Sequence, residues 1–127
     1  MSPQKKKILI VEDELIIAND IRGYLTEENF DITSVVLTGK DAIAEVKKQQ
    51  PDLVIMDILL HGEMNGIEAA EAIVKLKPIP IVFVSAYSHE EIVHKILSDV
   101  NYEYVLKPFQ SYELISKINL VLQNVED

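Results

Sequence analysis

The sequence predicts an α/β domain in which a parallel sheet carries helices on both faces. Short runs rich in β-branched residues alternate with segments whose apolar residues recur at helical spacing, and this alternation occurs five times. The runs that precede Glu12, Asp57 and Ser85 are almost continuously apolar, as in central parallel strands buried on both faces. Right-handed crossovers are therefore expected to join the strands.

The expected strands are short runs of mainly aliphatic and aromatic residues. Pro51 and the Pro78/Pro80 pair mark passages from a helix back to a strand. In chain order, the strands are expected at Ile8–Val11, Ile32–Leu37, Leu53–Met56, Ile79–Val84 and Tyr102–Leu106.

A helix is expected after each strand. In the last one, Leu114, Ile118 and Val121 lie on one apolar stripe, and Ile115 and Leu122 lie on the adjoining stripe. In chain order, the helices are expected at Glu14–Glu28, Gly39–Gln49, Gly66–Leu76, Glu90–Ser98 and Ser111–Asn124.

The composition fits a single domain spanning residues 1–127. A chain of 127 residues has a common domain size, and 48% hydrophobic residues suffice for one core. The lack of cysteine excludes a disulfide framework and a cysteine-based zinc site, which suits a cytoplasmic location. The first apolar stretch is too short for a signal peptide, and no segment reaches the length of a membrane span. A net charge of −9 argues against direct nucleic-acid binding.

Residues with charged or hydroxyl side chains follow four of the expected strands. Glu12 and Asp13 follow the first, Asp57 the third, Ser85 the fourth and Lys107 the fifth. Ligands of open parallel sheets bind outside the carboxyl ends of the strands, so these side chains are expected to share one pocket. Carboxylates gathered there repel one another unless a positive group lies among them, and a hard divalent cation with oxygen ligands meets that need. The pattern indicates phosphate chemistry.

Taken in order, the motifs VED ending at Asp13, MD at Asp57, VSA around Ser85 and YVLKPF from Tyr104 resemble the receiver domain of two-component response regulators. Each motif alone is weak, but their order and spacing are specific, and the resemblance covers essentially the whole chain. It implies a flavodoxin-like (βα)5 fold with strand order 2-1-3-4-5. It also implies that a histidine kinase or a histidine phosphotransfer protein donates a phosphoryl group to one aspartate.

The resemblance implies a set of roles around a Mg2+ ion. Asp57 matches the phosphoacceptor, whose carboxylate can attack phosphorus and form an acyl phosphate. Asp13, Asp57 and the backbone carbonyl of Leu59 are expected to bind the ion, with Glu12 reaching it through water. Without the resemblance, Glu12 and Asp13 are also explained as acids at a helix N-terminus, the role expected of Glu14.

The resemblance also implies partners for the phosphoryl group and a route to a signal. Lys107 is expected to place a point charge on the phosphoryl oxygens, aimed inward by a cis Lys107–Pro108 bond. Ser85 is expected to hydrogen-bond the group once it arrives. Tyr104 is then expected to change its rotamer, which alters the surface of the fourth helix, fifth strand and fifth helix.

The loop after Asp57 departs from the family pattern. It reads DILLHGEMNG, with His61 where proline is frequent and with one residue inserted before Asn65. Leu59 and Tyr87 occupy positions that in the family tune the access of water to the acyl phosphate. Both are bulky and lack an acid or amide, so slow self-dephosphorylation is expected.

The histidines do not form a metal motif. His89 and His94 are five residues apart, so they do not stack on one helix face as an i, i+4 pair does. His61 can approach the active site from its loop, although a solvated turn residue is the simpler interpretation.

Two other functions compete with a phosphoacceptor switch. Enzymes of the haloacid-dehalogenase type also use an aspartate and magnesium on a parallel sheet, but they expect an acid where this chain has Leu59. A receiver-like module that signals without phosphate is disfavoured because all matched site residues are present. We expect self-phosphorylation and slow self-dephosphorylation rather than the turnover of an enzyme.

The chain ends directly after the last expected helix, which indicates either a stand-alone receiver or the receiver portion of a longer protein. The apolar stripe of this last helix, beside Ile115 and Leu122, has two interpretations. One is a homodimer through the fourth helix, fifth strand and fifth helix, and the other is packing on the sheet. Neither a membrane nor nucleic acid is expected as a direct partner.

Overall fold

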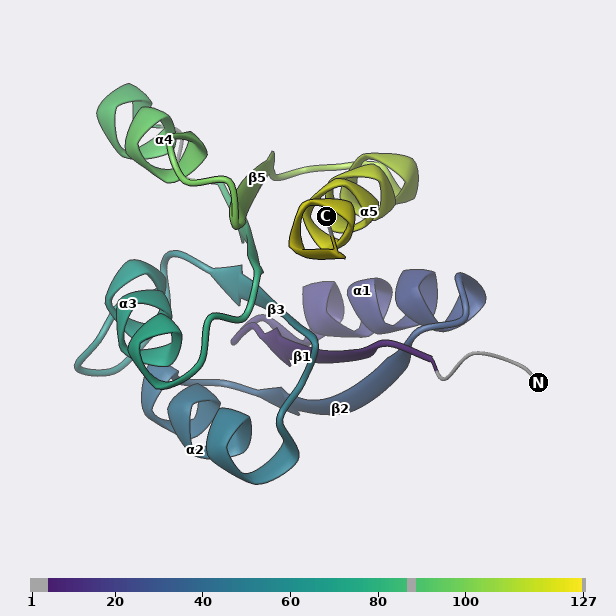
Figure 1. Cartoon of the computed structure of the whole chain (residues 1–127), viewed down its shortest axis with the longest axis horizontal. Coiled ribbons are helices and arrows are strands. Elements are labelled where there is room, and N and C mark those ends of the chain that lie inside the picture. Colours follow the sequence, from purple (N-terminus) through teal and green to yellow (C-terminus); the bar gives the residue numbers. More distant parts are fainter. Residues whose placement is uncertain (1–4, 87–88, 127) are drawn as a thin grey trace.

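The computed structural model describes residues 5–86 and 89–126, which form a parallel five-stranded sheet with helices on both faces (Figure 1). The order across the sheet is β2-β1-β3-β4-β5, which confirms the expected fold and topology. The strands are β1 (Lys7–Val11), β2 (Asp31–Val36), β3 (Leu53–Asp57), β4 (Ile81–Ser85) and β5 (Tyr102–Leu106). The helices are α1 (Leu15–Glu27), α2 (Gly39–Gln49), α3 (Gly66–Leu76), α4 (Glu90–Leu97) and α5 (Ser111–Glu126).

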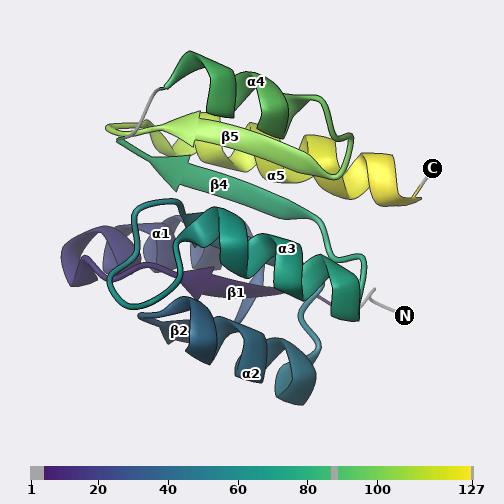
Figure 2. The ribbon, with the colours of Figure 1, turned by 90° about the vertical axis from the view of Figure 1, so that its left-hand side faces the viewer.

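The helices form two layers, with α1 and α5 on one face of the sheet and α2, α3 and α4 on the other (Figure 2). From β1 the chain passes to β2 on one side, and it then returns to β3 on the other side of β1. The strand order therefore reverses between β1 and β3, where open sheets of this kind bind their ligands.

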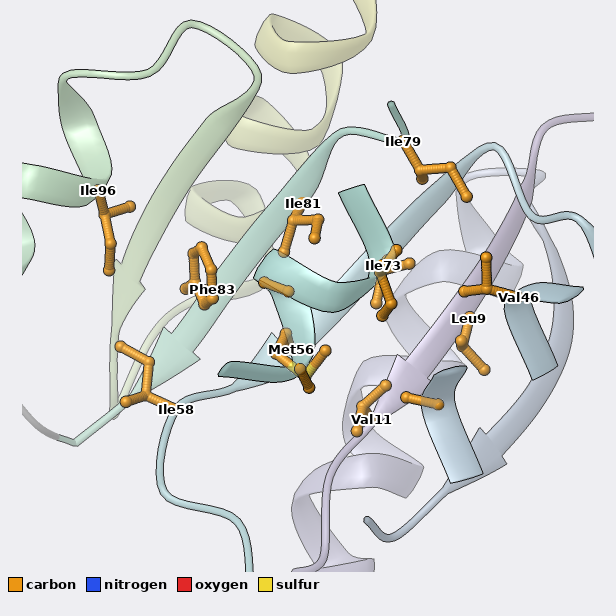
Figure 3. Close-up of a cluster of buried hydrophobic side chains, with 14 residues drawn as sticks. Leu9, Val11, Val46, Met56, Ile58, Ile73, Ile79, Ile81, Phe83 and Ile96 are labelled. Atoms are coloured by element: carbon orange, nitrogen blue, oxygen red, sulfur yellow. The ribbon is translucent and has the colours of Figure 1, made fainter. Parts of the chain in front are cut away.

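Strand β1 shows why the central strands are apolar throughout. Ile8 and Ile10 join the core under α1 and α5, whereas Leu9 and Val11 join the core on the α2 and α3 side (Figure 3). All four side chains are fully buried, because successive residues of a strand point to opposite faces and both faces are covered.

Local hydrogen bonds fix the starts of α2 and α3, whose bounds agree with the prediction. The Thr38 hydroxyl accepts from the backbone N–H of Asp41 at 3.1 Å. Asn65 and Glu68 form a reciprocal capping box before α3, with bonds of 2.9 and 3.0 Å.

Other element ends differ from the prediction by one or two residues. The strand expected from Ile79 begins at Ile81, because Pro80 has no N–H to give to the sheet. In contrast, β3 and β4 each extend one residue further, so that Asp57 pairs with Val84 and Ser85 with Leu106. The phosphate-site candidates on these strands are therefore fixed by the sheet itself.

The fifth helix buries its apolar stripe against the sheet. Leu114, Ile118 and Val121 are fully buried, and Ile115 and Leu122 pack beside them against the core under α1. The stripe is thus explained by packing on the sheet, and Ile115 and Leu122 do not favour a dimer interface.

Candidate functional site

Acidic side chains from the ends of two strands meet one ammonium group. The Lys107 Nζ atom, which follows β5, lies 2.7 Å from Glu12 Oε1 and 3.3 Å from Asp57 Oδ2. Carboxylate oxygens of Glu12, Asp13, Glu14 and Asp57 lie within 4.8 Å of one another. The sheet therefore gathers residues that are distant in sequence at one rim, as their positions after the strands predicted.

The backbone around Asp57 holds its carboxylate in place. Its Oδ1 atom accepts from the backbone N–H of Leu59 at 3.1 Å, which also brings the Leu59 backbone next to the acid. The N–H of Gly66, the first residue of α3, donates to the carbonyl oxygen of Ile58 at 2.8 Å. A Cβ atom at Gly66 would lie only 2.0 Å from the carbonyl oxygen of Asp57, so glycine permits this close approach.

Glu12 is a buried acid whose oxygens are both bound by the protein. It is fully buried, and while Oε1 accepts from Lys107, Oε2 accepts from the backbone N–H of Glu14 at 3.1 Å. Burial raises the pKa of Glu12, the hydrogen bond from Lys107 lowers it and the neighbouring Asp57 raises it, and the combined effect is a pKa of about 7. One ammonium alone therefore does not keep all of these acids fully charged at neutral pH.

Lys107 is fixed by both its backbone and its side chain. Its N–H donates to the carbonyl oxygen of Ser85 at 2.9 Å, and the Lys107–Pro108 bond is cis, as expected. Burial alone lowers the pKa of this ammonium, but the hydrogen bonds and charges of Glu12 and Asp57 outweigh it and raise the pKa above its usual value. Lys107 consequently stays positively charged.

The donor set fits a hard divalent cation. Three carboxylates, those of Glu12, Glu14 and Asp57, pair with the Lys107 ammonium. With Asp13 as a fourth, their oxygens are close enough together to share an ion. Oxygen ligands are those that Mg2+ prefers, and this ion keeps several waters, so a few carboxylates suffice. Because a cation would add positive charge among the acids, it would also favour their ionised forms.

Ser85 and Tyr104 are linked through the backbone. Ser85 is fully buried at the end of β4, and the Tyr104 hydroxyl donates to its carbonyl oxygen at 3.4 Å. Tyr104 is partly buried against the core on the α3 side, and this burial raises the pKa of its hydroxyl, which therefore stays protonated as a donor. Tyr87, expected to control water access, lies outside the described residues.

Two residues contribute more to this region than the sequence predicted. Glu14 precedes α1 but does not cap it, and its carboxylate lies 3.8 Å from Lys107. His61 is highly exposed, as a turn residue should be, yet its ring contacts Asp13. Their positions in the chain indicated proximity, but no local pattern shows where such side chains point.

The other two histidines lie at the start of α4 and within it. His89 precedes α4, and His94 is an exposed residue within α4. Neither belongs to the acidic group among the residues that the structure describes.

Comparisons with known proteins identify the family. Residues 8–119 match the model of the response regulator receiver domain. The chain is 32% identical over 122 residues to the transcriptional regulatory protein PdtaR of Mycobacterium tuberculosis, covering 96% of this chain and 59% of that protein. It is 33% identical over 127 residues to the DNA-binding response regulator MtrA of Mycolicibacterium smegmatis, covering 100% of this chain and 55% of that protein. The chain thus spans little more than half the length of these relatives.

Solved structures agree with this assignment. A CheY-like response regulator receiver domain protein from Methanospirillum hungatei has a TM-score of 0.85 and 28% identity, with 97% of this chain and 98% of that chain covered. The N-terminal domain of a response regulator/sensory box/GGDEF protein from Carboxydothermus hydrogenoformans has a TM-score of 0.83 and 35% identity, with 95% and 97% covered.

The chain therefore belongs to the receiver domains of response regulators, the signalling switches of two-component systems. Within the described part of the chain, none of the helices has the length and apolar character needed to cross a bilayer.

Proposed function

We propose that residues 1–127 form a single receiver domain in which Asp57 takes a phosphoryl group from a phosphohistidine. The donor would be a histidine kinase or a histidine phosphotransfer protein in the cytoplasm. The observation that carries the proposal is the arrangement at Asp57, where the N–H of Leu59 holds Oδ1 and the ammonium of Lys107 lies 3.3 Å from Oδ2. A carboxylate held this way at the rim of the sheet can act as a nucleophile.

The transfer exchanges one bond to phosphorus for another. An oxygen of Asp57 forms the new O–P bond while the N–P bond to the donor histidine breaks, and the leaving imidazole nitrogen takes up a proton. Lys107 stabilises the charge on the phosphoryl oxygens, and Ser85 supplies a hydrogen bond to one of them. Mg2+, held by Asp13, Asp57 and the carbonyl of Leu59, with Glu12 beside it, would supply further positive charge.

The test is phosphorylation by a small donor. The protein is incubated with acetyl phosphate and Mg2+, and its intact mass is measured. We expect a mass increase of one phosphoryl group that requires Mg2+ and is lost in Asp57→Asn, which keeps the size of the side chain. A second outcome, steady release of phosphate over many turnovers, would favour a haloacid-dehalogenase-like phosphatase instead.

Leu59 is expected to slow the hydrolysis of the acyl phosphate. Its side chain is exposed beside Asp57 and carries no group that can hold a water molecule. We predict that Leu59→Asn speeds dephosphorylation about fivefold, since an added hydrogen bond to the attacking water is worth about 1 kcal/mol. Loss of the phosphorylated mass after donor removal gives the rate, with the exposed Leu76→Asn as the control. An unchanged or slower rate would count against this role.

Tyr104 is expected to couple phosphorylation of Asp57 to a change in the surface formed by α4, β5 and α5. Its hydroxyl bonds the carbonyl of Ser85, the residue whose side chain is proposed to turn toward phosphate. Beryllofluoride with Mg2+ mimics the phosphoryl group, and we predict that it shifts the NMR signals of Tyr104 and of α4. Asp57→Asn should abolish these shifts. If beryllofluoride binds without altering either set of signals, the proposed switch is wrong.

A homodimer through α4, β5 and α5 remains our proposal for one output of the switch. The exposed apolar side chains of Leu97 on α4 and Leu106 on β5 support it. Lys117 and Glu103 form an ion pair of 3.3 Å between α5 and β5. Sedimentation with and without beryllofluoride tests whether phosphorylation promotes the dimer.

A further inference from the structure

His61 contacts one oxygen atom of the acidic site from the loop that follows β3. Its backbone N–H donates to Asp13 Oδ2 at 3.1 Å, and its ring Nδ1 contacts the same oxygen. The ring contact requires a proton on Nδ1, because a carboxylate can only accept. Two donors from a single residue therefore hold Asp13 Oδ2.

The two partners have very different surroundings. The side chain of His61 is 92% exposed, whereas that of Asp13 is only 10% exposed. The imidazole ring thus adds little to the core, and its replacement should cost little stability. Asp13, in contrast, is one of the acids expected to bind the cation, so its orientation matters for the site.

The geometry separates two roles for the ring, direct ligation and support of a ligand. The ligand atoms of Glu12, Asp13, Glu14 and Asp57 lie within 4.8 Å of one another, and His61 is not a member of this group. With Nδ1 turned to Asp13, the ring reaches the ion only through that carboxylate. Hydrogen bonds to a metal ligand orient it, and losing one typically lowers metal affinity about 10- to 100-fold.

We propose that His61 is a positioning residue for the divalent cation. By holding Oδ2 of Asp13, it fixes the orientation of this carboxylate before the cation binds, so that Asp13 loses less conformational freedom on binding. This inference rests on the proposed function, because it assumes a cation at the acidic site. It assigns a task to the histidine of the lengthened loop, in which the following Gly62 adopts a φ of +107°.

Calorimetric titration of the full chain with MgCl2 tests the role. His61→Ala removes the ring donor but keeps the backbone donor, so we expect the Kd for Mg2+ to rise about tenfold, the lower end of the usual range. In His61→Asn the amide nitrogen takes the place of Nδ1, which should restore affinity close to that of the unaltered protein. In His61→Gln the nitrogen lies at the place of Nε2 and should not restore it.

Controls separate positioning from a general effect on the fold. His94→Ala removes an exposed histidine of α4 and should leave the Kd unchanged. Thermal unfolding without Mg2+ should be the same for all variants. Equal or tighter Mg2+ binding by His61→Ala would overturn the inference while leaving the proposed function intact. No Mg2+ binding by the unaltered protein would overturn both.

Discussion

Replacing Lys107 by methionine is expected to lower the rate of Asp57 phosphorylation by acetyl phosphate about 10²- to 10³-fold, as the loss of one preorganised donor to a transition state does elsewhere. The Lys107 ammonium is bonded to Glu12 and Asp57 at 2.7 and 3.3 Å, so it lies where the phosphoryl charge would develop. Methionine keeps most of the length of the side chain but removes its charge. The rate is measured from the growth of the phosphorylated mass at fixed Mg2+.

The control for this variant is Lys117→Met. Lys117 also pairs with an acid, Glu103 at 3.3 Å, but this acid does not belong to the acidic site, so the variant should not affect the rate. Lys107→Met should still fold, because Glu12 can take up a proton once its partner is lost, its pKa already being about 7. Equal rates for the two variants would show that the Lys107 charge does not act on the phosphoryl group.

Gly66→Ala is expected to destabilise the protein by about 3 kcal/mol, the upper end for overpacking of a close contact. Helix propensity acts in the opposite direction, because alanine is favoured over glycine by about 1 kcal/mol in a helix interior and by less at a first position such as Gly66. The contact decides the sign, because the added Cβ would lie 2.0 Å from the carbonyl oxygen of Asp57 and 2.9 Å from Cα of Ile58. Since both neighbours are backbone atoms of the acceptor segment, phosphorylation should slow as well.

Gly23→Ala is the matched control. Gly23 lies in the middle of α1 with no atom within 4 Å of its would-be Cβ, so alanine should stabilise the protein by about 0.5 to 1 kcal/mol. Urea unfolding of both variants gives the two free energies. A Gly66→Ala protein as stable as Gly23→Ala would contradict the close approach of α3 to Asp57.

The fold and the meeting of the main site residues were predictable because both depend on regular features. Buried strands are apolar on both faces, and the carboxyl ends of parallel strands lie at one edge of the sheet, which brings Asp57 and Lys107 together. The cis Lys107–Pro108 bond was also foreseen, although only through the resemblance to a family.

The remaining features depend on contacts that no local pattern encodes. The contact of His61 with Asp13 depends on the path of the whole loop between β3 and α3, including the positive φ of Gly62. Glu14 looked like a helix-start acid, but the charge of Lys107, more than 90 residues away in the chain, lies near its carboxylate. Strand β3 ends at Asp57 and not at the expected Met56, because Asp57 still pairs with Val84 of the neighbouring β4.

The most direct test of the central claim is to locate the phosphoryl group. The protein is phosphorylated with acetyl phosphate and Mg2+, digested at low pH, and the modified peptide is sequenced by mass spectrometry. We expect a single modification at Asp57 that hydroxylamine removes, as an acyl phosphate should be. A hydroxylamine-resistant phosphate on Ser85, or a modification at Asp13 instead of Asp57, would contradict it.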